Sequence, residues 1–282
     1  MKWSSEPFSK ESRNRRLRQD DRVNSVQLFT SMYCGVIAAM VCIRHADQFA
    51  YLKLTRPILG PARILHRWPV PRLRDAQFHA TGAGLALTLL MSAAGVFPRA
   101  ALLLAVAFYF LYFGQISSLS YVQRKIYLMP QILLLLAVAP DPGRSSHAAA
   151  PAWPLLMVQA ILAQMYLSSA FCKIRTSGIR WASWKQLQGI LLEEHLTYDL
   201  PLSARLAQSR WFCGIFGVGA LAFELTFWVI LVIPRSAAPY AVTGLLLHVS
   251  ALILMRIDYL TYHVPVYLVF AATPLARLLH AP

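Results

Sequence analysis

The chain carries little negative charge and little charge overall. Its 282 residues include 12 Asp and Glu against 27 Lys and Arg, and charged residues make up 14% of the sequence. Because soluble domains average about 25% charged residues, this composition argues against an ordinary water-soluble fold. No long polar block divides the sequence. We therefore expect one membrane domain, residues 26–279, behind a basic polar arm, residues 1–25.

Cysteine is also scarce. The chain has four, Cys34, Cys42, Cys172 and Cys213, which all fall in or beside apolar runs and form no C-x-x-C pair. This placement favours small packing residues over a disulfide framework or a metal site. No metal is predicted.

Apolar residues are abundant, at 57% of the chain. They gather in runs that approach the roughly 20 residues a transmembrane helix needs. The first run lacks an A-x-A cleavage site, so we expect no cleavable signal peptide. The predicted fold is all-α: a polytopic membrane bundle of about eight transmembrane helices with interfacial amphipathic helices. The expected spans are residues 26–43, 78–97, 100–120, a short proline-containing segment within 120–139, 153–172, 213–233, 239–255 and 259–279.

Two connections should lie at the membrane surface. Residues 44–77 mix basic, apolar and proline residues, which is typical of a short helix in the headgroup plane. Residues 185–212 should form an amphipathic region. Its Glu193, Glu194, His195 and Asp199 have only weak metal-ligand character, because adjacent acids and one histidine on a polar segment are usually solvated.

The net charge of +15 suggests nucleic acid in a soluble protein, but no nucleic-acid-binding motif is present. Attraction to anionic lipid headgroups explains the charge at helix ends more simply. With a cytoplasmic N-terminus, most loop cations fall on the far side, against the positive-inside rule. Three explanations stay open: an external N-terminus, a first run that does not cross fully, or a basic face that attracts an anionic substrate.

Ionisable residues within apolar runs are costly and usually face the bundle interior in pairs. Lys173, at the end of residues 153–172, is either a snorkelling anchor beside the interfacial Trp181 or a partly desolvated base with a lowered pKa. Glu224 and His248 lie within later spans. They form either a structural hydrogen bond with each other or part of a catalytic or ligand site. Arg256 and Asp258 are expected to form an interfacial pair.

Four segments, taken in order, resemble one family: SYVQRKIYLMPQILLL (120–135), YLSSAFCKI (166–174) followed by Trp181, FELTFWVIL (223–231), and LLLHVSALILMRIDYLTYHVPVYLVF (245–270). They are similar to the membrane domain of vitamin K-dependent γ-glutamyl carboxylase and its bacterial relatives, the horizontally transferred transmembrane (HTTM) proteins. The likeness covers roughly residues 22–279.

The resemblance implies a multi-pass protein of the bacterial inner (plasma) membrane. In that family, a lysine acts with reduced vitamin K, a quinol, and oxygen to generate a strong base, and carbon dioxide is then added to a substrate carbon. Lys173 falls at the catalytic lysine position, and we expect Glu224 and His248 to complete the catalytic group. The expected substrate-binding residues are Arg124, Lys125, Arg175, Trp181, Tyr262 and His263.

The sequence departs from the family at Lys125, which stands where the family has a histidine in N-H-x-Y-L. A lysine there can bind carbon dioxide or an anion, or act as an interfacial cation, so glutamate carboxylation does not follow from the resemblance. Two other functions remain: a non-catalytic membrane protein that assists maturation or export of a small peptide, and a lipid or small-molecule transporter. The transporter ranks low because no inverted repeat is evident.

Overall fold

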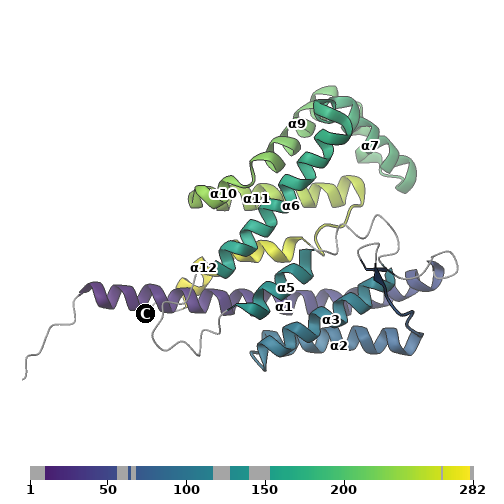
Figure 1. The fold of residues 1–282 in the computed structure, drawn as a ribbon. Coiled ribbons are helices and arrows are strands. Elements are labelled where there is room, and N and C mark those ends of the chain that lie inside the picture. The colour runs from purple at the N-terminus through teal and green to yellow at the C-terminus, as the bar shows by residue number, and fades with distance from the viewer. Residues whose placement is uncertain are drawn as a thin grey trace, which may run out of the picture.

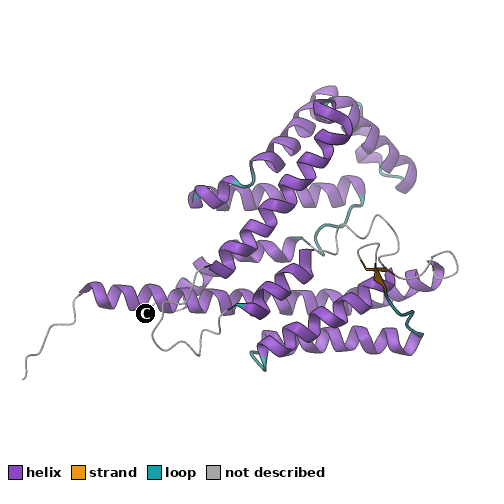
Figure 2. Cartoon of the chain, viewed as in Figure 1, coloured by secondary structure: helices purple, strands orange, loops and turns teal. Residues whose placement is uncertain are grey.

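A computed structural model describes residues 10–55, 63–64, 68–116, 128–139, 153–261 and 263–279 (Figure 1). Within these ranges the chain is helical except for loops and one short strand pair (Figure 2). Strands β1 (Arg63–Ile64) and β2 (Trp68–Pro69) pair antiparallel. The all-α prediction is confirmed for the described part of the chain.

The N-terminal half contains four helices, α1 (Lys10–Thr55), α2 (Asp75–Ala93), α3 (Pro98–Ile116) and α5 (Leu128–Val138). Each packs mainly against the next one in this order. Gly95 and Phe97 have positive φ angles of 74° and 45° in the tight turn between α2 and α3, a conformation that favours glycine. The core here is unusually aromatic, and Phe29, Tyr33 and Phe78 are fully buried.

The C-terminal half lies in the upper part of Figure 1, where α6 packs against α9 and meets α11 through a hydrogen bond between side chains. Its elements are α6 (Trp153–Ser177), η1 (Gly178–Ala182), α7 (Trp184–Tyr198), α8 (Pro201–Ala207), α9 (Arg210–Thr226), α10 (Val229–Val232), η2 (Pro234–Ser236), α11 (Ala237–Met255), η3 (Val264–Tyr267) and α12 (Leu268–Leu279). The last of these, α12, packs back onto α1 and joins the two halves.

The described residues contain four helices long and apolar enough to cross a membrane, or five if α8 and α9, bent by 95°, count as one span. The four are Ser25–Leu54, Pro98–Gln115, Trp153–Ala182 and Pro234–Met255. Helix α5 is apolar but has 11 residues, fewer than the roughly 20 needed to cross. By length and composition these helices suit a multi-pass membrane protein, and the described residues hold four or five long spans where eight were expected in the chain.

Helix boundaries differ from those expected. The first span does not end near residue 43, because α1 continues unbroken to Thr55. Residues 44–55 favour helix, and the first proline after the span is Pro57, so nothing interrupts the backbone hydrogen bonds earlier. The expected interfacial segment thus begins as an extension of α1. The predicted amphipathic region at 185–212 holds α7 and α8, and Asp199 ends α7 in the left-handed conformation.

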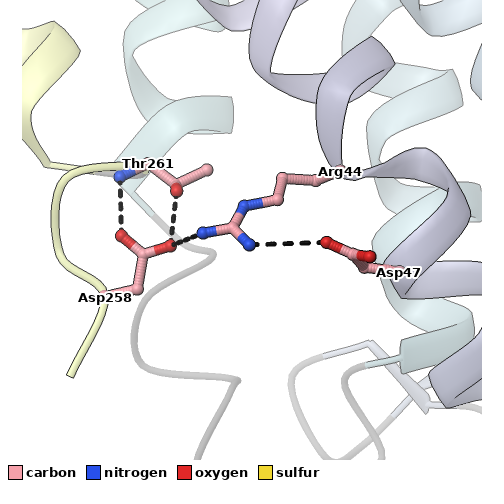
Figure 3. Close-up of polar contacts among 4 residues, drawn as sticks. All are labelled: Arg44, Asp47, Asp258 and Thr261. Carbon is pink, nitrogen blue, oxygen red and sulfur yellow. Dashed lines mark hydrogen bonds and ion pairs between the residues drawn. The ribbon is translucent and has the colours of Figure 1, made fainter. Parts of the chain in front are cut away.

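An ion pair ties α1 to the loop after α11 (Figure 3). Arg44 donates to Asp258 Oδ2 at 2.9 Å and to Asp47 at 3.4 Å, while Asp258 accepts from the backbone N–H and hydroxyl of Thr261. The expected Arg256–Asp258 pair is therefore wrong. Arg256 ends α11 in the left-handed conformation, and the carboxylate turns toward α1 instead. The Arg44–Asp258 contact fastens the loop that carries Tyr259 and His263.

We expect Asp258→Asn to lower the thermal midpoint by about 2–4 °C. The two side chains are 44% and 26% exposed, and a pair this exposed contributes about 1 kcal/mol or less. Scanning fluorimetry in detergent measures the shift. Asp47→Asn is the matched control, since it removes the longer contact within α1 and leaves the loop attached. Equal shifts in both variants would contradict a tether between Arg44 and Asp258.

Candidate functional site

Helix α6 presents three polar side chains on one face. Tyr166, Ser169 and Lys173 are spaced i, i+3 and i+7, which aligns side chains along one side of an α-helix. Helix α9 packs against this face. The site is therefore built on two rigid helices, and its first polar centre lies where they meet.

Lys173 and Glu224 form that centre. The lysine Nζ lies 2.5 Å from Glu224 Oε1, and the Ser169 hydroxyl donates to the same oxygen at 3.3 Å. The two charged side chains are 24% and 13% exposed. The other carboxylate oxygen, Glu224 Oε2, is buried and has no hydrogen-bond partner among the residues that the structure describes. A buried acceptor without a partner is costly, so this atom is a natural contact for a ligand donor.

Trp181 covers the lysine from the other side. Lys173 Nζ lies 4.1 Å from the centre of the indole ring, within the range of a cation–π contact. Helix η1, which carries the tryptophan, approaches α9 closely at Gly217. A Cβ at this glycine would lie 3.2 Å from the Ala182 carbonyl oxygen, so the absence of a side chain permits the approach. The predicted interfacial tryptophan is thus part of the lysine's immediate surroundings.

A second polar centre lies two turns earlier on α6. The Tyr166 hydroxyl is 2.6 Å from His248 Nε2 of α11 and is also hydrogen-bonded to the Tyr267 hydroxyl of η3. Gly244 of α11 makes room for Tyr267, since a Cβ there would overlap the phenol hydroxyl. Three elements distant in sequence therefore converge on one phenol–imidazole cluster.

An aromatic ring of α9 and one from the residue that caps its C-terminal end connect the two centres. Phe223 meets Tyr166 edge-on at 5.1 Å and Phe227 packs tilted against it at 4.5 Å, both measured between ring centres. Because Phe223 directly precedes Glu224, one turn of α9 contributes both the aromatic wall and the carboxylate. The polar groups thus lie in a largely apolar, aromatic setting.

The loop after α11 closes one side of the second centre. The rings of Tyr259 and His263 lie 5.0 Å and 5.5 Å from the His248 ring, and His263 is buried. The tethered Asp258 precedes both residues, so the ion pair with α1 supports their position.

The structure brings together some of the expected site residues and separates others. Lys173, Glu224 and Trp181 form one cluster, and His248 lies near His263 in the other. Of the two alternatives for Glu224 and His248, the hydrogen bond between them is wrong, because Glu224 pairs with Lys173 while His248 pairs with Tyr166.

Arg175 is exposed. It lies two residues beyond Lys173, which points it to a different side of α6. Arg124, Lys125 and Tyr262 lie outside the described residues. Among the described residues, no group of three His, Cys, Asp or Glu could hold a metal ion, and all four cysteines are free.

Sequence reasoning missed Tyr166, Ser169 and Tyr267. The first two carried a usable signal, since they repeat at helical spacing with Lys173 on an otherwise apolar run. Tyr267 had none: it resembles any aromatic of an apolar segment, and only the fold brings it to α6.

No family model, no curated protein and no solved structure matches the chain in comparisons with known proteins. A function must therefore be inferred from the residues of the chain itself.

We expect Gly244→Ala to lower the thermal midpoint, because the new methyl group would displace Tyr267. Overpacking costs about 1–3 kcal/mol, which exceeds the gain of about 1 kcal/mol from replacing a helical glycine. Adding Tyr267→Phe removes the overlapping hydroxyl and should recover part of the loss in thermal unfolding.

Gly219→Ala is the matched control. A Cβ at this α9 position meets nothing within 4 Å, so it should leave the midpoint unchanged or raise it. If both alanine variants unfold at the same temperature, Tyr267 does not pack closely against Gly244.

Proposed function

We propose that the chain is an integral-membrane enzyme of the HTTM type, resembling the membrane domain of vitamin K-dependent carboxylase. Lys173 would exchange a proton with a quinol-like or other lipophilic aromatic substrate, in a reaction with oxygen and, in its carboxylating form, carbon dioxide. The observation that carries the proposal is the Lys173–Glu224 pair, in which a lysine meets a carboxylate whose second oxygen is buried and has no hydrogen-bond partner among the described residues.

The carboxylate would position the lysine and accept its proton. Lys173 Nζ donates to Glu224 Oε1 at 2.5 Å. To act as a general base, Lys173 would release this proton to Oε1, and rotation about its Cε–Nζ bond would then turn the lone pair toward the substrate hydroxyl. Ser169 would hold the carboxyl oriented through its contact with Oε1.

The residues fit an aromatic diol. Lys173 and Glu224 Oε2 offer two polar atoms for hydroxyl groups, and Trp181 and Phe223 offer aromatic surface for a ring. When bound, a reduced quinone would supply the reducing equivalents that the family uses with oxygen. The chain's own contribution would be to bind the ring, orient a hydroxyl group and take up its proton.

The second centre would serve as a positioning group. Tyr166 lies on the same face of α6 as Lys173, and its hydroxyl is held between His248 and Tyr267. This network fixes the Tyr166 ring, against which Phe223 and Phe227 of α9 pack. His248 would thus act through Tyr166 on the shape of the aromatic wall.

The membrane location and several substrate-binding residues of the proposed enzyme involve parts of the chain outside the described residues. The enzyme would lie in the inner (plasma) membrane of a bacterium with about eight crossings, to which the shorter apolar helices would contribute. Arg124 and Lys125 would hold an anionic group, such as bicarbonate or a substrate carboxylate, and Tyr262 would join His263 beside the substrate. Membrane lipids would be the other partners.

Lys173→Ala and Glu224→Gln should each reduce the occupancy of a co-purifying quinone. Losing a hydrogen bond to a charged group costs about 1.5–3 kcal/mol, which corresponds to about ten- to hundredfold in affinity. Native mass spectrometry of detergent-purified protein, followed by lipid extraction, measures the bound quinone directly.

Lys185→Ala is the matched control for this experiment. Lys185 also contacts a tryptophan, Trp184, at 5.7 Å, yet it is exposed and no carboxylate contact is found for it among the described residues. Its loss should leave quinone binding unchanged. Phospholipid alone in all four proteins would make Lys173 an anchor and favour the accessory role in small-peptide maturation or export.

A further inference from the structure

A second group of titratable side chains lies in the other half of the molecule. It joins three helices: His45 of α1, His79 of α2 and Tyr112 of α3. The Tyr112 hydroxyl is 2.7 Å from His45 Nδ1, and His45 Nε2 is 2.7 Å from His79 Nδ1. The two contacts use both ring nitrogens of His45, which therefore links the phenol to the second histidine.

The surrounding residues leave room for this arrangement. A Cβ on Gly82 would lie 2.9 Å from ring atoms of both His45 and Tyr112, so a larger residue there would displace them. Phe78 stacks on both rings, with centres 5.5 Å and 4.5 Å away. The three side chains are thus held in line by packing as well as by hydrogen bonds.

The cluster runs from the core to the surface. Tyr112 is fully buried, His45 is partly buried and His79 is exposed. His79 lies one turn from the start of α2, where Asp75 meets Lys53 of α1 at 3.9 Å. Such charged residues mark the end of the helices that faces water or headgroups. The exposed end of the cluster therefore lies where protons are available.

The hydrogen bonds among Tyr112, His45 and His79 can run in either of two directions. Two ring nitrogens 2.7 Å apart cannot both present lone pairs, so one of them carries a proton. In one arrangement Tyr112 donates to His45 Nδ1, His45 Nε2–H donates to His79 Nδ1, and His79 Nε2–H points outward. In the other, the His79 Nδ1–H donates to His45 and the His45 Nδ1–H donates to Tyr112.

We propose that Tyr112, His45 and His79 form a proton-transfer chain between the core of the N-terminal half and water. Outward transfer moves the phenol proton to His45 Nδ1, the His45 Nε2 proton to His79 Nδ1 and the His79 Nε2 proton to water. One proton leaves the phenol, which becomes a phenolate that accepts from His45 Nδ1–H, one proton reaches water, and both imidazoles stay neutral. Inward transfer reverses each step.

Three charged groups lie near the chain. Arg44, the neighbour of His45 in sequence, contacts Asp258 and Asp47. Lys53 and Asp75 face each other across α1 and α2. The hydrogen bonds of His45 lead from the buried Tyr112 to the exposed His79, so His79 is the member of the chain nearest water. The proposal is independent of the Lys173–Glu224 pair and of the function proposed for it.

The chain can be tested by placing a fluorinated tyrosine, which has a more acidic phenol, at position 112 of the full-length protein in nanodiscs. Its ¹⁹F resonance reports the phenol and phenolate forms during a pH titration. In the otherwise unchanged protein we expect one averaged line, because the chain exchanges the phenol proton rapidly. In His79→Gln, whose amide cannot relay a proton, exchange should slow at least tenfold and separate lines should appear.

The same label at position 33 serves as the control. Tyr33 is equally buried, and its hydroxyl has no hydrogen-bond partner among the described residues, so it should not exchange rapidly. Identical line shapes with and without His79, or rapid exchange at position 33 as well, would overturn the proposal. A folding defect in His79→Gln would appear in the circular dichroism and thermal midpoint, and His79→Asn would then replace it.

Discussion

The contact between Lys173 and Glu224 sets the arrangement of the C-terminal half. A charge in an apolar helix is costly unless it has a partner, and each of these residues is the other's ion-pair partner among the described residues. Removing one would leave the other charge unpaired, a penalty larger than the pair's own net contribution. The rotation of α6 and α9 about their axes is therefore constrained. The placement of Phe223 and Phe227 against Tyr166 follows from it, since both are fixed on α9 relative to Glu224.

The sequence was informative about which residues matter and much less so about their partners. Lys173, Glu224 and His248 are visible because ionisable residues interrupt apolar runs, and Trp181 follows at a recognisable distance. Pairing depends on how helices rotate and cross, which no local pattern encodes. A hydrogen bond between Glu224 and His248 was therefore left open as one alternative, whereas the fold pairs Glu224 with Lys173. Tyr166 and Tyr267 are harder still, because a tyrosine in an apolar segment resembles a packing residue until a histidine is found opposite its hydroxyl.

Hydropathy also predicts that a segment is helical more reliably than it predicts where the helix ends. Hydropathy identified the apolar runs and hence the all-α class, yet it placed the end of the first helix at residue 43. A helix ends where its backbone hydrogen bonds are interrupted, and α1 continues through polar residues to Thr55. This extension has a consequence for function, because Arg44 and His45 lie on it. Were residues 44–55 a separate surface helix, neither side chain would have a fixed position relative to α2 or to the loop after α11.

One turn of α1 thus connects two polar systems of different design. Arg44 reaches the Asp258 loop, which carries His263 toward His248, and His45 reaches Tyr112 and His79. The Lys173 centre is an ion pair in an aromatic setting, formed by two groups on adjacent helices. The His45 cluster contains no carboxylate or ammonium group, so the proposed transfer crosses it by exchange of hydrogen-bond direction and leaves no charge on the imidazoles. The arrangement of the second system suits such a transfer, because its buried end is a phenol enclosed by Phe78 and its exposed end is a single imidazole.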